Sequence, residues 1–337
     1  LTESTNRYEL ADFSEYNDIF LLHNSSGKLN GVKESIFMEN IKDYSFRWRW
    51  NMVNDFRPQS IESSGIKSYP TANYVNYYGM QNGYPINDMT KADAESGYDP
   101  THPWKNRDPR FYKTIMFDGV KWRNTGGAGG TAELFTGGRE SEEANEKKGC
   151  FTAYMNSKLC PQLMNTFDGY KENNIMILSL MRLADVYLMY AEATAVGYNS
   201  PKGKAATYSL TAEEALNKIR ERAGVAPVLE KFLGSTADFL SELRRERAVE
   251  LSFEGFRFTD LRRWMLLTQY PYTLKTKIEF DRADPNNYNY DAPEENAIKN
   301  LREVVLIERK YTDRHYWYPL PKKDVSMYEG FYQNPGW

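Results

Sequence analysis

The residues that could do chemistry in this sequence are first of all the carboxylates of RERAVELSFEGFRFTDLRRW, residues 245–264. Glu246, Glu250 and Glu254 recur at every fourth position among five arginines, and Asp260 follows them. A pair of carboxylates can cleave a glycan when they face each other across a cleft and one has a raised pKa. Carboxylates on one helix among arginines are instead held ionised, which is the wrong state for a proton donor. The stretch therefore predicts an ion-paired helical corner and no catalytic residues.

The expected pairing follows from helical spacing. Glu250 and Glu254 should pair with arginines three positions away on the same helix. Gly255 would end that helix and let the next one fold back toward it. The residues that could then reach the glutamates are Arg257, Asp260 and Arg262.

The second half of the chain, residues 171–337, reads as a helical scaffold. Apolar periodicity predicts helices over 175–197 and 211–224, and the second has Thr211 and Glu214 placed as a capping box. Two further helices are expected from Ser235 to Gly255 and from there to about Leu267. Small alanines at the expected contacts make the first pair similar to a TPR unit.

The first half, residues 1–170, reads as a loop-rich region with short elements. A strand is expected at Glu34–Met38, and a short helix should begin at Pro70-Thr71. The segment FYKTIMFDGVKW, residues 111–122, alternates apolar and polar residues around Asp118-Gly119, which predicts a small β-hairpin. The predicted fold is mainly α, with the helix pairs of the second half as a platform. The first half is expected to face a ligand, and the two halves together are expected to form one unit.

Composition excludes several classes of protein. The 337 residues hold 43 Lys plus Arg against 46 acids, a net charge of -3, so no basic field favours nucleic acid. No apolar run approaches the roughly 18 to 20 residues of a membrane span. Cys150 and Cys160 could form a disulfide or remain free thiols, and neither they nor the scattered histidines suggest a metal site or a cofactor.

Aromatic residues are unusually frequent for so polar a chain. It has 25 Tyr, 17 Phe and 7 Trp, with a mean hydropathy of -0.70. Many rings must therefore lie near the surface, where they could stack on flat ligands or close gaps in an irregular fold.

The motifs also carry a family resemblance. The segments RLADVYLMYAEA, EEALNKIRERAGV, LRRERAVELSFEGFRFTDLRRW, YPLPKKDV and QNPGW follow one another between residues 182 and 337. Upstream, PTANYVNYYGMQNGYPI and DPRFYKTIMFDG extend the series to residue 70. Together they resemble the SusD/RagB family, the nutrient-binding surface lipoproteins of Bacteroidetes outer membranes.

The resemblance implies a non-catalytic binder with a TPR-like platform. Family members capture oligosaccharides, or in some branches peptides, and deliver them to a SusC-like TonB-dependent transporter in the outer membrane. They usually begin with a lipid-anchored cysteine and N-terminal helices, and neither precedes Leu1 here. We therefore expect a membrane attachment through a lipid anchor that this chain does not carry. No binding residue of the family can be matched to these motifs.

Candidate ligand residues must then come from chemistry. In DYSFRWRWNMVNDFRP, residues 43–58, Trp48 and Trp50 alternate with arginines including Arg47, and Asn51 lies close by. In an extended chain both tryptophans share one face, which could stack on sugar rings; the alternative is a strand whose tryptophans close the core. Second choices are Trp104 and Trp122, for which a structural role is the competing interpretation.

Three further hypotheses remain open. The loop DRADPNNYNYD, residues 281–291, could ligate calcium, although an Asx-rich turn explains the same residues. A glycoside hydrolase would need two converging carboxylates, for which Asp43 and Asp55 are the pair to test. A TPR-like adaptor that binds other proteins is the third class.

Overall fold

The structure is a computed structural model of the 337-residue chain. It describes residues 7–22, 32–38, 68–86, 93–124, 130–144, 146, 148–160, 165, 167–169 and 175–337.

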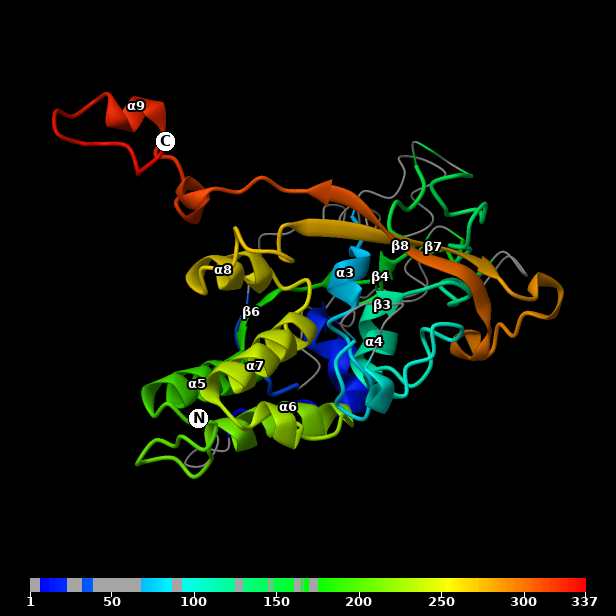
Figure 1. Ribbon diagram of the computed structural model, residues 1–337, viewed down its shortest axis with the longest axis horizontal. Coiled ribbons are helices and arrows are strands. Elements are labelled where there is room, and N and C mark those ends of the chain that lie inside the picture. Colours follow the sequence, from blue (N-terminus) through cyan, green and yellow to red (C-terminus); the bar gives the residue numbers. More distant parts are fainter. Residues whose placement is uncertain are drawn as a thin grey trace.

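Helices dominate the part of the molecule built from residues 183–263 (Figure 1). Among the described residues, the four longest α-helices are α5 (Leu183–Gly197), α6 (Ala212–Ala223), α7 (Thr236–Glu250) and α8 (Phe256–Arg263). α5 packs against both α6 and α7 through small side chains such as Ala191, Ala195 and Ala215, which let the backbones approach closely. The mainly helical prediction is confirmed at this level, and the TPR-like character of the pair α5–α6 stays a prediction.

The caps of these helices match the sequence signals. The Thr211 hydroxyl accepts from the Glu214 amide, and the Glu214 carboxylate accepts from the Thr211 amide, which is the capping box expected for α6. Gly224 ends the helix at φ 71°. At the start of α7 the Ser235 hydroxyl accepts from the Asp238 amide.

Two helix boundaries differ from the prediction. The helix expected from residue 175 begins at Leu183, because residues 175–176 and 179–182 pair as strands instead. α7 ends at Glu250, before Gly255. The Glu250 carbonyl accepts from the side chains of Tyr16, Lys158 and Arg182, and is therefore not free to continue the helix.

Within the described ranges, eight strands pair two by two as antiparallel sheets. The pairs are β1 (Leu21–Leu22) with β5 (Ile175–Met176), β2 (Ser35–Met38) with β6 (Ser179–Arg182), β3 (Ile115–Met116) with β4 (Met155–Asn156), and β7 (Leu274–Arg282) with β8 (Ile298–Glu308). The short α-helices are α3 (Ala72–Val75), α4 (Pro109–Thr114) and α9 (Lys322–Val325). The 3-10 helices are η1 (Phe13–Phe20), η3 (Ala94–Ser96), η5 (Glu230–Phe232), η6 (Pro285–Asn287), η7 (Pro293–Glu295) and η8 (Asp313–Tyr316). The strand near Glu34–Met38 and the helix after Thr71 are confirmed.

The hairpin predicted over residues 111–122 is wrong. Asp108 caps α4 and Pro109 opens it, so a helix occupies the first arm, and β3 pairs with β4 instead. A turn does form at Asp118-Gly119, where Gly119 has φ 83° and the Val120 amide donates to the Phe117 carbonyl. The arm after it runs beside residues 130–132.

A long hairpin, β7–β8, lies in the half of the chain that the sequence predicted to be helical. It runs across one side of the molecule, with α3 beneath it and α8 near its open end (Figure 1). Alternate residues of β7 are buried, among them Thr276, Ile278 and Phe280. The division of the chain at residue 170 stays a prediction. The largest core cluster among the described residues contains side chains from both halves, Trp104 and Phe117 from the first and Ile278 and Phe280 from the second.

The segment after β8 extends away from the helices to α9 and the C-terminus (Figure 1). Tyr316 ties its beginning to α8, because the Arg262 guanidinium donates to the Tyr316 carbonyl. Several aromatic side chains beyond this point are exposed: Trp317, Tyr318, Tyr328 and Tyr332. No helix among the described residues is long and apolar enough to cross a membrane.

Candidate functional site

The carboxylates of residues 245–264 lie inside a buried ion-pair network. Glu250 Oε1 is 2.6 Å from Arg182 Nη1 and 2.5 Å from Arg222 Nη2, and its Oε2 is 3.0 Å from Arg110 Nη1. Glu254 lies 2.7 Å from both Arg182 Nε and Lys158 Nζ. The predicted ion-paired corner is therefore present, with partners from distant parts of the chain.

Glu246 forms the second half of this network. It pairs with Arg110, and its other oxygen is 3.0 Å from Arg220 Nε. Arg220 in turn binds Glu242 at 2.7 Å, and Arg110 binds Asp108 at the same distance. All these side chains are almost completely buried.

The electrostatics of the network exclude a proton-donor role for Glu250. Burial alone would raise the pKa of Glu250, but the guanidinium groups of Arg222 and Arg182 hold it well below its usual range. Burial lowers the pKa of Lys158 to about 8, although Glu254 opposes the shift. A carboxylate held ionised in this way cannot protonate a glycosidic oxygen.

The predicted pairing partners within 245–264 were wrong in detail. Asp260 binds Arg247, at 2.9 Å, and binds no glutamate. The Arg257 guanidinium donates to the Tyr77 hydroxyl, and that of Arg262 to the Tyr316 carbonyl. Gly255, at φ 90°, turns α8 outward, which carries these arginines away from the buried carboxylates.

The first-choice ligand residues lie outside the described part of the chain. They are Arg47, Trp48, Trp50 and Asn51, and their role stays a prediction. The same holds for the hydrolase pair Asp43 and Asp55.

Both second-choice tryptophans lie in the core. Trp104 has no exposed surface, lies 5.0 Å from the Phe117 ring, and donates its indole N–H to the Tyr154 hydroxyl. Trp122 is 6% exposed and lies edge-on to Phe167. Neither ring offers a free face to a ligand in this structure. This burial fits the competing interpretation, in which both tryptophans have a structural role.

A cavity of about 860 Å³ is lined entirely by other residues. It lies between the start of α3, the turn from α7 to α8, and the open end of the β7–β8 hairpin. Its volume falls within the range of small-molecule sites, about 300–1,000 Å³.

Aromatic side chains from four segments form much of its wall. The rings of Tyr69 and Phe151 lie 5.8 Å apart, and those of Tyr74 and Phe253 lie at the same separation. Phe258 of α8 completes this set and is 38% exposed. Rings in such positions provide flat apolar faces with polar groups nearby.

Three cationic side chains line the same cavity. Arg257 comes from α8, Lys275 from β7, and Arg309 from the residue after β8. Burial, together with the nearby charges of Arg309 and Arg257, lowers the pKa of Lys275 to about 8. The cavity therefore combines aromatic faces with hydrogen-bond donors.

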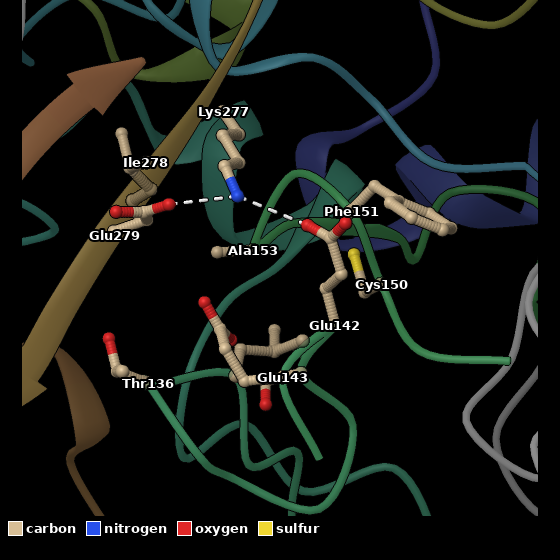
Figure 2. A pocket seen from close by; sticks show the side chains of 11 residues that line it. Thr136, Glu142, Glu143, Cys150, Phe151, Ala153, Lys277, Ile278 and Glu279 are labelled. Carbon is tan, nitrogen blue, oxygen red and sulfur yellow. Dashed lines mark hydrogen bonds and ion pairs between the residues drawn. The ribbon is translucent and has the colours of Figure 1, made fainter. Parts of the chain in front are cut away.

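A second hollow, of about 10 Å³, shares Phe151 with this cavity. Figure 2 shows Lys277 pointing between two carboxylates there, with Nζ 3.1 Å from Glu142 and 2.8 Å from Glu279. Cys150 lies beside them. The hollow is no larger than a single water requires, so it is no sugar site.

The calcium and cysteine hypotheses have simple outcomes. Within the described ranges no three His, Cys, Asp or Glu side chains gather so as to hold a metal ion. In the loop after β7, Asp284 caps η6, as in an Asx-rich turn. Asp281 lies inside β7 and accepts from the side-chain amide of Asn300 in β8. Cys150 and Cys160 do not form a disulfide with each other.

Sequence reasoning missed most of the cavity. Tyr69, Phe151, Phe253 and Lys275 are far apart in the chain, and only folding brings them together. One signal was present: in LKTKIEF, residues 274–280, polar and apolar residues alternate, which is typical of a strand with one buried face.

Comparison with known proteins identifies the architecture. The sequence matches the model of the SusD family over residues 33–337. A SusD-like protein from Bacteroides fragilis NCTC 9343 shares 22% identity with a TM-score of 0.70, over 98% of this chain and 59% of its own. A SusD-like carbohydrate binding protein from the same strain shares 19% identity with a TM-score of 0.63, and the match covers 94% of this chain and 57% of that protein.

A SusD superfamily protein from Bacteroides vulgatus ATCC 8482 is similar over 80% of this chain and 46% of its own, with 21% identity and a TM-score of 0.51. The chain thus spans about 60% or less of the length of these structures. No curated protein matches the sequence. At these sequence identities, the similarity to the solved structures shows a shared fold and does not by itself show the ligand.

Proposed function

The chain belongs to the SusD family, and from that premise we propose that it binds oligosaccharides without cleaving them. The observation that carries the proposal is the cavity of about 860 Å³ between α3, α8 and β7–β8, with its aromatic walls and three cations. Sugars present flat C–H faces and planar sets of hydroxyls, which match aromatic rings and guanidinium donors.

The absence of cleavage follows from the state of the carboxylates. Glu246, Glu250 and Glu254 are bound by arginines and a lysine, and the arginines hold the pKa of Glu250 well below its usual range. No Asp or Glu lines the cavity among the described residues. A hydrolase needs two carboxylates facing its ligand, so the cavity supports binding alone.

The setting proposed for this binding is the bacterial cell surface. The family membership supports an outer-membrane location and delivery of the ligand to a SusC-like TonB-dependent transporter. The solved structure of a SusD-like carbohydrate binding protein with the same fold supports an oligosaccharide over a peptide as the cargo.

The test is titration calorimetry of the chain against neutral and acidic oligosaccharides and against short peptides, with products analysed in the same samples. We expect oligosaccharide binding with no change in chain length of the sugar. Binding of peptides alone would reverse the choice of ligand. Any cleavage that follows the concentration of purified chain would overturn the non-catalytic function.

A further inference from the structure

The cavity carries more positive charge than the described residues neutralise. Its three cations come from separate elements, Arg257 from α8, Lys275 from β7 and Arg309 from beyond β8. No carboxylate among the described residues lines the cavity with them.

Lys275 shows the imbalance most clearly when compared with Lys277, two positions along β7. The ammonium of Lys277 lies between the carboxylates of Glu142 and Glu279, at 3.1 and 2.8 Å (Figure 2). Lys275 has no hydrogen bond or ion pair with any described residue, and its charged neighbours in the cavity are two guanidinium groups. A half-buried charge without a counter-charge is costly, and a bound anion would remove that cost.

The carboxylates of the adjoining turn and helix are engaged elsewhere. Glu254 is bound by Lys158 and Arg182, and Asp260 by Arg247 and Arg263. They do not turn toward Lys275. The counter-charge must therefore come from outside this set.

The other two cations keep free donors. Arg257 uses one Nη to donate to the Tyr77 hydroxyl and stacks on that ring at 4.6 Å. Arg309 is exposed and donates from Nη1 to the Tyr311 hydroxyl. Each guanidinium has five N–H donors, so both retain groups that could bind a carboxylate or sulfate.

We propose that this cavity selects anionic oligosaccharides, with a carboxylate or sulfate of the sugar bound at Lys275 between Arg257 and Arg309. The sugar ring would lie against the wall of Tyr69, Phe151 and Phe258. The proposal rests on the proposed function, and it names the substrate class of the same site.

The pKa of Lys275 is consistent with this role. Burial, together with Arg309 and Arg257, lowers it to about 8, so the side chain is still charged at neutral pH. A bound anion favours the charged form, so its binding should raise this pKa.

The experiment pairs each acidic glycan with a neutral counterpart. Titration calorimetry at low ionic strength would use oligogalacturonides and their methyl esters, glucuronate-containing oligosaccharides and their carboxyl-reduced forms, and sulfated and desulfated galactans. The variants are Lys275→Gln and Arg309→Gln. The matched control is Lys299→Gln, which removes an equal charge from an exposed position of the same hairpin outside the cavity. Thermal unfolding would verify that each variant is folded.

We expect at least one acidic glycan to bind about tenfold or more tightly than its neutral counterpart, and Lys275→Gln to remove that difference while Lys299→Gln keeps it. Tighter binding of the acidic member in the uronate pairs would show that the anion is a carboxylate, and in the galactan pair that it is a sulfate.

Equal binding within every pair would overturn the anionic proposal and leave oligosaccharide binding standing. Binding to no glycan would overturn the proposed function as well. Tighter binding of a glutamate-rich peptide than of any acidic glycan would show that the cations serve a different class of ligand, which also overturns the proposal.

Discussion

Arg182 Nη1 lies 2.6 Å from Glu250 Oε1, and neither side chain has any exposed surface. The two residues are 68 positions apart, so this pair fixes the junction of β6 and α5 to the end of α7. Glu34, the residue just before β2, lies 2.6 Å from the same Arg182 nitrogen. Three separate segments of the fold are therefore held at one buried point.

Removing the charge at this point should be costly. We expect Glu250→Gln to lower the free energy of unfolding by about 3–5 kcal/mol, because it leaves Arg182 and Arg222 buried with too little negative charge. Urea denaturation would measure the loss. The control is Glu221→Gln, which removes an exposed pair with Lys218 and should change stability by about 0.5 kcal/mol or less. If Glu250→Gln and Glu221→Gln lowered the free energy of unfolding by equally small amounts, the buried network would not contribute to stability.

The same carboxylate gives a pH dependence. The folded-state pKa of Glu250 lies well below 4.5, so its contribution to stability is complete above about pH 4.5 and is lost as the pH falls toward the folded-state pKa. Unfolding free energies measured from about pH 7 to pH 3 should therefore decline below pH 4.5. The decline should be shallower in Glu250→Gln. An unchanged slope in that variant would contradict the assignment.

Lys275 should show a conflict between stability and binding. Its pKa is lowered to about 8 in the fold, so at pH 7 the side chain is still charged and keeping it charged costs the folded state stability. We expect Lys275→Met to raise the free energy of unfolding there by about 1–2 kcal/mol, because the cost of holding this half-buried charge is removed. The gain should be largest below about pH 8 and fade toward the usual pKa of lysine, about 10.4.

Thermal unfolding across this pH range would measure the effect, with Lys299→Met as the exposed control. A less stable Lys275→Met protein would mean that the lysine has a structural role in the hairpin, contrary to its unpaired state in the cavity.

The aromatic wall and the predicted tryptophan run can be separated by mutation. We expect the double change Tyr69→Ala, Phe258→Ala to weaken oligosaccharide binding about tenfold, because two ring contacts of roughly 0.5–1.5 kcal/mol each are removed. The control is Tyr198→Ala, an exposed ring outside the cavity.

Trp48→Ala, Trp50→Ala is the companion variant for the run at residues 43–58. Loss of binding in this variant alone would place the ligand at the tryptophans, and loss in both would join the two regions in one site. Calorimetry with the oligosaccharide that binds most tightly to the unchanged chain gives the comparison.

Local chemistry made several elements predictable. The capping box of Thr211 and Glu214, the stop at Gly224 and the Ser235 cap involve atoms within a few residues of one another, and all are present. The ion pairing of the glutamates was also predictable, because arginines are the most frequent opposite charges nearby in the sequence.

The errors came from partners distant in the sequence. The end of α7 depends on Tyr16, Lys158 and Arg182 binding the Glu250 carbonyl, and none of these lies near it in the chain. The hairpin of residues 111–122 failed because β4 was a better partner for β3 than the adjacent arm. Propensity cannot reveal such competition, since it contains no information on which segments meet.

The sequence by itself determined the family, the helical scaffold and the ionised character of its charged corner, since these depend on order, spacing and neighbouring residue types. Only the tertiary structure decided that Trp104 and Trp122 are enclosed in the core and that no carboxylate from the described part of the chain pairs with Lys275. Burial and pairing are properties of the space around a side chain. That space is filled here by residues such as Phe117, Phe280 and Arg309, whose approach only the folded chain determines.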